Sequence, residues 1–284
     1  MKDTTEFQKK IELLDSKHES IEKHVTGTAF YIDDLPDIEG MLHAYIGISK
    51  CAYGRITSIN LDAVKSSEGV VDVLTAEDIP GINDISPTGL NDEPVLATKE
   101  VEFWGQPIFV VLARTRNQAR FAARLGEIIY DKYDPVISIA DAERGGCKLV
   151  TPGLKLERGD VKTALKKAPN RISGKILIGG QDHFYLEGHI ALAIPGEDDD
   201  VLVYSSTQHP SEVQHMVARV LGTNSNAVTV QVRRMGGGFG GKETQSNLFA
   251  VIAAFASKKF GKAVKIRPDR DDDMIITGKR HDFL

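Results

Sequence analysis

The sequence predicts a mixed α/β fold in two units, and three observations support it. Short runs rich in β-branched residues alternate with segments whose apolar residues recur at helical spacing. Residues 135–173 are rich in proline and glycine with weak periodicity, as linkers are. Beyond them, the stretch 235–243 (MGGGFGGKE) places five glycines between a strand pattern and a helix pattern. We therefore expect a polar leader (1–17), a first unit (18–134), the linker and a second unit (174–284).

The first unit alternates strands with short helices. The leader is polar, and no function is assigned to it. Helical patterns are predicted at 62–67, at 75–78 and from an N-cap at Asn117 to about Tyr130, where small and apolar residues would pack on a sheet. The first two strands are predicted to form an antiparallel pair. The strand patterns of this unit lie at 26–32, 42–48, 55–61, 70–74 and 107–113.

The second unit contains strand patterns at 182–189, 201–206, 227–232 and 263–266. A helix should begin at Pro210 and end before Gly222, which suits the C′ position, and another should cover 244–260. Thr207, Gln208 and His209 precede the first helix. At that place they either contact a ligand or cap the helix.

A strand at 182–189 would place alternate side chains on one polar face. His183, Glu187 and His189 on that face are either metal ligands or hydrogen-bond partners of neighbouring segments, and the second interpretation is favoured. Gln181 follows a glycine pair at the start of the strand, where its amide can offer both a donor and an acceptor to a ligand.

The composition excludes several classes of protein. A formal net charge of −5 without a Lys/Arg cluster argues against a nucleic-acid surface. The acidic runs 197–200 and 269–273 are predicted to be solvated loops. Two distant cysteines provide neither a disulfide framework nor a cysteine-bound cluster, which fits a reducing cytoplasm. No stretch approaches a signal peptide or the roughly 18 apolar residues of a membrane span.

The glycine stretch points backbone amides at an anion, and its motif allows more than one interpretation. Gly236, Gly238 and Gly241 satisfy G-x-G-x-x-G, typical of dinucleotide binding, although a run of five glycines makes that match easy. Residues 236–242 also satisfy G-x-x-x-x-G-K, but Glu243 follows where a phosphate-binding loop needs Ser or Thr. A tight turn without a ligand is the remaining alternative.

Longer strings carry a family resemblance. The chain resembles the large, molybdenum-binding subunits of the molybdenum hydroxylases, the xanthine dehydrogenase and aldehyde oxidase family, and its xanthine dehydrogenases most closely. TGTAFYIDDLP, AEDIPG and NDEPVLA resemble that family's hammerhead α/β domain, which implies a hammerhead domain followed by the first part of a molybdopterin-binding domain. The strings of the second unit are IGGQDHFYLE (178–187), STQHPSEVQHMVARVLG (206–222), VRRMGGGFGGKET (232–244) and DRDDDMIITGKRHDF (269–283).

The resemblance implies a molybdenum atom held by the dithiolene of a pyranopterin cofactor, molybdopterin, rather than by side chains. By motif position, Gln181 would hydrogen-bond a molybdenum oxygen, and the backbone amides of Phe239 and Gly240 would contact the cofactor. Glu243 would face the substrate and favour a purine, hypoxanthine or xanthine, over a simple aldehyde. The family's reaction hydroxylates a carbon next to a ring nitrogen.

The resemblance also implies partners. Electrons would leave through 2Fe-2S clusters and FAD on partner subunits, because two cysteines cannot hold a cluster here. The general base and a second cofactor motif are expected beyond Leu284, in the remainder of the molybdenum subunit, so the isolated chain is expected to be inactive. Lys279 and Asp282 depart from the family's pattern near the end. The alternatives are a non-catalytic structural or interaction fragment and, less favoured, a nucleotide-binding protein.

Overall fold

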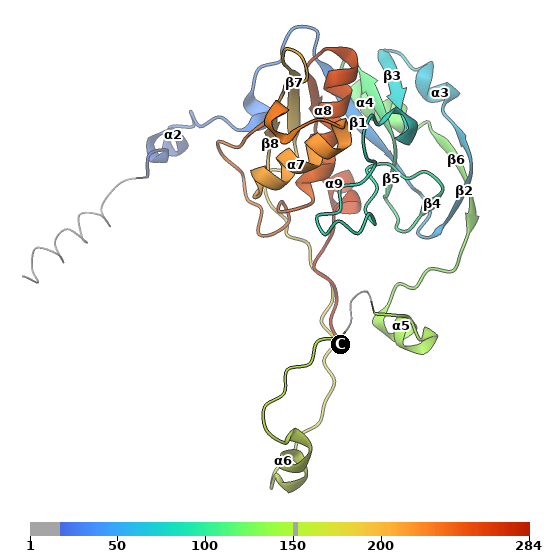
Figure 1. Ribbon diagram of the computed structural model, residues 1–284, viewed down its shortest axis with the longest axis vertical. Helices are drawn as coiled ribbons and strands as arrows, with labels where there is room; N and C mark the ends of the chain where they lie inside the picture. The colour runs from blue at the N-terminus through green and yellow to red at the C-terminus, as the bar shows by residue number, and fades with distance from the viewer. Residues whose placement is uncertain (1–17, 150–152) are drawn as a thin grey trace, which may run out of the picture.

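The computed structural model describes residues 18–149 and 153–284, so the polar leader predicted at 1–17 lies outside the described residues. Two sheets form the body (Figure 1). The smaller has the order β4 (Glu100–Val101), β2 (Gly54–Asn60), β6 (Glu127–Lys132). The larger has the order β3 (Val70–Leu74), β5 (Pro107–Ala113), β1 (Leu42–Ile48), β10 (Val264–Ile266), β7 (Ala191–Pro195), β8 (Val201–Ser205), β9 (Val228–Gln231).

The larger sheet joins both halves of the sequence. Strand β1 pairs antiparallel with β5 and parallel with β10, with Leu42 opposite Val264. Strand β10 in turn pairs antiparallel with β7. Backbone hydrogen bonds therefore run without a break from the first predicted unit into the second.

Helices cover both faces of the larger sheet, and the side chains of its strands alternate accordingly. Helices α7 (Pro210–Leu221) and α8 (Ser246–Phe260) pack on one face with Val110 and Leu112 of β5. Phe109 and Val111 of the same strand face α3 (Asp62–Lys65), α4 (Arg116–Ala123) and the smaller sheet. All seven residues of β5 are buried, as its apolar run predicts.

Several predicted elements are confirmed. Strands β1, β3 and β5 have the predicted bounds, and β2, β8, β9 and β10 differ by one or two residues. Helix α7 begins at Pro210 and ends before Gly222, which is left-handed with φ 67°. The mixed α/β class is confirmed. Helix α4, however, is capped by Thr115 rather than Asn117 and ends at Ala123, so Tyr130 belongs to β6.

Two predicted strands are wrong. Residues 26–32 follow helix α2 (Ile21–Val25). The amides of Thr28 and Ala29 donate to the carbonyl of Lys23 in that helix, and not to a neighbouring strand. These residues lead into a short 3₁₀ turn, Ile32–Asp34, so no antiparallel pair forms with β1. Residues 182–189 also form no strand, because Phe184 is left-handed with φ 49° and its amide donates to the Asp182 side chain.

The acidic run at 269–273 is not a solvated loop. Asp269 is the N-cap of helix α9 (Arg270–Ile276), and Asp271, Asp272 and Asp273 form its first turn. Carboxylates are favourable there because the helix dipole places positive charge at that end. Asp273 is only 1% exposed, so its carboxylate is bound inside the protein.

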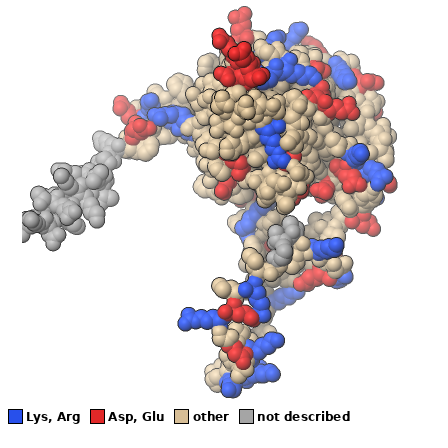
Figure 2. Space-filling view, viewed as in Figure 1, with Lys and Arg blue, Asp and Glu red and all other residues tan. Residues whose placement is uncertain are grey.

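An arm extends from the body between β6 and β7. It carries helices α5 (Ile139–Gly145) and α6 (Val161–Lys167), and its returning chain runs beside the last residues through bridges between Ile178 and Phe283 and between Gln181 and Arg280 (Figure 1). Basic and acidic side chains are interspersed on the face shown in Figure 2. Among the described residues, no helix has the length and apolarity needed to cross a membrane.

Candidate cofactor-binding site

The stretch 235–243, here called the glycine bend, lies between strand β9 and helix α8 as predicted. Gly237 and Gly240 have φ values of 96° and 92°, which only glycine adopts readily. Phe239 between them is also left-handed with φ 53°, an unfavourable conformation for a residue with a side chain. Its ring is 75% exposed, so burial of the ring does not hold this backbone in place.

Two side chains hold the bend, one from each side. The Glu187 Oε2 atom accepts a hydrogen bond of 2.8 Å from the Gly236 amide. The Gln208 Oε1 atom accepts bonds from the Gly240 amide at 2.9 Å and the Lys242 amide at 3.2 Å. The backbone amide of Gln208 also donates to the Lys242 carbonyl at 2.8 Å. The strained conformation is therefore fixed by contacts outside the bend.

Lys242 anchors the bend from inside the protein. Its side chain is 0% exposed, and its Nζ atom donates to the Glu187 carbonyl at 2.6 Å and to Ser206 Oγ at 2.8 Å. Nζ also lies 3.2 Å from Glu187 Oε2 and 4.7 Å from the centre of the Tyr185 ring. Burial lowers the pKa of Lys242, and the Glu187 carboxylate opposes that shift. A lysine committed in this way cannot reach a phosphate at the surface of the bend.

The dinucleotide interpretation also lacks its structural context. That motif needs a strand, a helix and an adjacent parallel strand. Helix α8 begins at Ser246, five residues after Gly241, and the strand that follows it, β10, is separated from β9 by β7 and β8 in the sheet. The glycines therefore do not form the turn of a compact βαβ unit.

A buried polar cluster lies behind the bend. The Tyr185 hydroxyl donates to Asp273 Oδ1 at 2.6 Å, and the backbone amide of His189 donates to Asp273 Oδ2 at 2.6 Å. His189 Nδ1 lies 3.1 Å from Asp273 Oδ1. Burial lowers the pKa of His189, so the imidazole is neutral at pH 7. The contacts thus support the hydrogen-bonding interpretation of His189 over the metal-ligand one.

The charge of Asp273 is stabilised by these donors. Burial alone would raise the pKa of Asp273, but hydrogen bonds from His189 and Tyr185 outweigh burial and hold the pKa well below its usual range. The same contacts raise the pKa of Tyr185 far above its usual value, first by burial and then through Asp273. The cluster therefore holds one fixed negative charge among neutral donors.

The segment that carries Gln181 lies against the glycine bend. A Cβ atom on Gly241 would lie 2.7 Å from the His183 ring and 2.9 Å from Tyr185 Cε1, so glycine is needed for this contact. Gln181 itself is exposed, and its backbone pairs with Arg280 in both directions at 3.0 Å. In the described part of the chain its side-chain amide makes no hydrogen bond. It is therefore available to a ligand.

The other predicted site residues differ in what they offer. Within the described residues the amides of Gly237, Gly238 and Phe239 have no hydrogen-bond acceptor, and Glu243 is exposed with no hydrogen bond to its side chain. The amide of Gly240 is instead bonded to Gln208. The free amides at 237–239 fit an anionic group of the expected cofactor. The Gly240 amide fits it only if Gln208 releases it.

Sequence reasoning missed the supports of the bend. The sequence predicts that Gln208 lies at a strand end and either contacts a ligand or caps the helix; in the structure it has a third role, as a brace of the bend. Thr207 does cap locally, accepting from the His209 amide at 3.0 Å. The acidic run alone predicts a solvated Asp273, because its partners, Tyr185 and His189, are more than 80 residues away in the sequence.

Comparisons with known proteins cover almost the whole chain. The family model of the molybdopterin cofactor-binding domain matches residues 146–284, and that of the aldehyde oxidase and xanthine dehydrogenase a/b hammerhead domain matches residues 26–134. Mouse xanthine dehydrogenase/oxidase is 42% identical over 269 residues, which cover 94% of this chain and 20% of that protein. Bovine aldehyde oxidase 1 is 40% identical over 263 residues, which cover 92% of this chain and 20% of that protein.

A solved structure shows the same fold. The aldehyde oxidoreductase of Desulfovibrio gigas superposes with a TM-score of 0.83 at 24% identity, over 93% of this chain and 31% of that one. The chain spans about a fifth of the length of the curated relatives it matches. The hammerhead domain and the start of a molybdopterin-binding domain, both expected from the sequence, are thereby confirmed.

Proposed function

Because the chain belongs to the aldehyde oxidase and xanthine dehydrogenase family of molybdenum hydroxylases, we propose that its glycine bend forms one wall of a molybdopterin site. The observation that carries this proposal is the free amides of Gly237, Gly238 and Phe239, held rigidly beside the segment of Gln181. Amides fixed in this way bind anionic groups without reorganising. The Gln181 amide would hydrogen-bond the same group from the other segment.

Four residues would act on the cofactor or the substrate. The Phe239 amide and the Gln181 side chain would position the cofactor. The Gly240 amide would contribute a second hydrogen bond once its own bond to Gln208 Oε1 is broken. Glu243 would receive the substrate, because its exposed carboxylate can accept hydrogen bonds from the N–H groups of a purine such as hypoxanthine or xanthine. When bound, the molybdenum group supplies the two-electron oxidation that accompanies hydroxylation of the substrate carbon.

Catalysis is proposed to occur in an assembled complex. The general base would come from the remainder of the molybdenum subunit, and iron-sulfur and FAD subunits or domains would carry the electrons away, so turnover by these 284 residues alone is not expected. Both cysteines in the described part are free, Cys51 buried and Cys147 exposed. This usage supports a reducing compartment, and we place the complex in the cytoplasm.

The proposal is tested with the assembled enzyme that contains this chain. Molybdenum content of the purified complex should be close to one atom per chain, and a complex without molybdenum would favour the non-catalytic interaction alternative. Glu243→Ala should reduce kcat/KM for xanthine by about 10²-fold or more and leave turnover of a small aldehyde within about threefold. Glu68→Ala is the control, because its carboxylate is exposed and lies beside β3, at the other end of the larger sheet from β9 and the bend. Equal losses on both substrates would remove Glu243 from the substrate site.

A further inference from the structure

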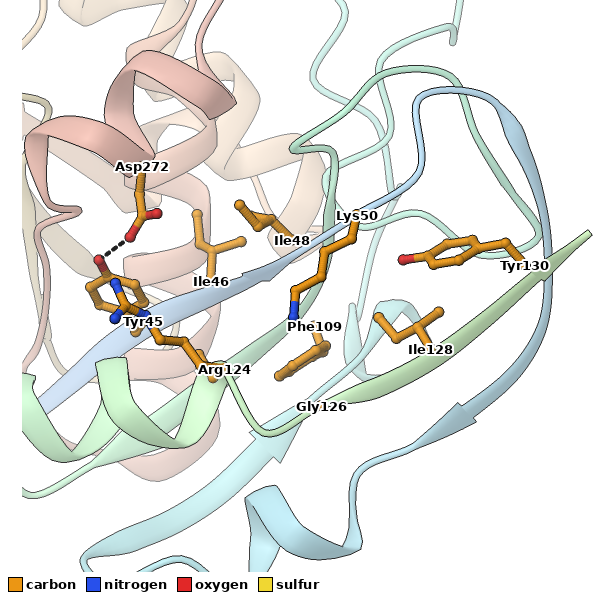
Figure 3. Close-up of a pocket in the computed structure, with 11 residues that line it drawn as sticks. Tyr45, Ile46, Ile48, Lys50, Phe109, Arg124, Gly126, Ile128, Tyr130 and Asp272 are labelled. Atoms are coloured by element: carbon orange, nitrogen blue, oxygen red, sulfur yellow. Dashed lines mark hydrogen bonds between the residues drawn. The ribbon is translucent and has the colours of Figure 1, made fainter. Parts of the chain in front are cut away.

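A second cavity lies away from the glycine bend, between strand β1, helix α4 and strand β6 (Figure 3). Its volume is about 320 Å³, within the usual range of small-molecule sites. None of the four candidate cofactor or substrate residues lines it. The cavity therefore needs an explanation of its own, independent of the proposed function.

The floor of the cavity is apolar and already formed. The Phe109 ring is 1% exposed and fits because two neighbours lack side chains. A Cβ atom on Gly126 would lie 2.6 Å from Phe109 Cζ, and one on Gly47 would lie 2.1 Å from it. Ile46, Ile48 and Ile128 extend this surface. An apolar body placed here would gain burial without rearranging the wall.

The cavity also carries two positive charges without partners. Lys50 and Arg124 line it, both are exposed, and neither lies within 4.0 Å of a carboxylate in the described part of the chain. Figure 3 shows the Lys50 amine directed toward Phe109 and the Arg124 side chain reaching toward Tyr45. Arg116 and Arg120 on the same helix, by contrast, both pair with Asp269.

Among the described residues that line the cavity, Asp272 carries the one carboxylate, and it forms no ion pair with Lys50 or Arg124. Asp272 accepts the hydrogen bond of the Tyr45 hydroxyl, and the amide of Asp269 donates to that same hydroxyl oxygen. Burial and the hydrogen bond to Asp272 raise the pKa of Tyr45 to about 12, so the phenol stays protonated and keeps Asp272 engaged. The lining thus combines an apolar floor with a net positive rim.

We propose that this cavity binds a small amphipathic monoanion, an aromatic or medium-chain carboxylate. Its apolar body would lie against Ile48 and Ile128, which are only half-buried, and its carboxylate would pair with Lys50 and Arg124 through charge-assisted hydrogen bonds. A neutral apolar ligand would make no ionic contact with the two cations, and a small polar anion would make no apolar contact with the floor of the cavity. The two features together select a molecule that has both parts.

The test is a titration of the ¹⁵N-labelled chain with 2-naphthoate, followed by NMR. Saturable shift changes are expected at the amides of Lys50, Gly126 and Ile128. The neutral analogue 2-naphthamide and the double variant Lys50→Glu/Arg124→Glu should each bind at least about tenfold more weakly, because either removes the ionic contacts. Lys65→Glu/Lys132→Glu, which changes the net charge equally at exposed residues outside this lining, should bind like the unchanged chain.

Three results would overturn the proposal. Equal affinity for the acid and the amide would show that charge plays no part. Unchanged binding by Lys50→Glu/Arg124→Glu, with a folded spectrum, would place the anion elsewhere. Shift changes centred on exposed apolar residues of the arm, such as Leu154 and Leu156, would indicate nonspecific binding. None of these results bears on molybdenum content, so the two proposals fail independently.

Discussion

Replacing Glu187 by glutamine tests whether the buried ion pair holds the glycine bend. Glutamine keeps the shape of the side chain and an oxygen for the Gly236 amide, but it removes the negative charge 3.2 Å from Lys242 Nζ. At that distance and an effective dielectric constant of about 20, the lost Coulomb attraction is about 5 kcal/mol. Lys242 is fully buried, so its charge cannot turn to water instead.

The expected loss in the free energy of unfolding is about 3 to 5 kcal/mol, as for other buried pairs that lose one partner. Urea unfolding followed by circular dichroism measures it. Lys242→Met should cost a similar amount, and the double variant should cost at least about 2 kcal/mol less than the sum, because the two changes remove the same interaction. Glu19→Gln is the matched control, since its pair with Arg233 at 3.1 Å is exposed and should contribute less than about 1 kcal/mol.

The reasoning is refuted if the two single changes add in the double variant to within about 0.5 kcal/mol. Additivity would mean that Glu187 and Lys242 stabilise the protein through separate contacts. It would also mean that the Glu187 bond to the Gly236 amide, rather than the ion pair, fixes the start of the bend. A Glu187→Gln cost no larger than that of Glu19→Gln would lead to the same conclusion.

Three further predictions concern the same region. Gly241→Ala should lower the free energy of unfolding by about 1 to 3 kcal/mol, because the new methyl group would collide with the His183 ring. Gly174→Ala, with nothing within 4 Å of its Cβ, should change that free energy by less than about 0.5 kcal/mol, and urea unfolding compares the two variants. The lowered pKa values of His189 and Asp273 mean that the unfolded chain binds more protons, so stability should decline as pH falls below about 6.5 and again below about 4. In urea midpoints, Asp273→Asn should make the second decline smaller; it should not abolish it, because the pKa of Asp78 and that of Asp182 are also lowered. Gln208→Ala should speed hydrogen exchange of the Gly240 and Lys242 amides by about tenfold in NMR, and unchanged rates would contradict its role as a brace.

Much of the fold could be predicted because it is encoded locally. The apolar run of β5 and the Pro210 and Gly222 signals of α7 depend on neighbouring residues alone, and the structure reproduces both. The strand expected at 182–189 failed for the opposite reason. There the His189 amide is bonded to a carboxylate on α9, a contact that alternation along the chain cannot reveal.

The candidate site shows the same division. The glycine motif could be located from sequence, since its residue types are unusual and contiguous. Which amides of the bend are already hydrogen-bonded could not be predicted, because this depends on Glu187 and Gln208, which reach the bend from other segments. In the sequence Lys242 stands out only as part of the G-x-x-x-x-G-K match; its burial depends on contacts of its Nζ atom with Ser206 and Glu187, which lie in other segments.

The parallel ladder between β1 and β10 has a consequence for how the molecule is made. Strand β1 gains β5 on one edge soon after both strands leave the ribosome, but its other edge is completed only by β10, which is synthesised after the linker and most of the second unit. Pairings so distant in sequence form slowly. A nascent chain that still lacks β10 therefore presents an open sheet edge, and we expect chaperones to shield this edge until Ile266 has left the ribosome.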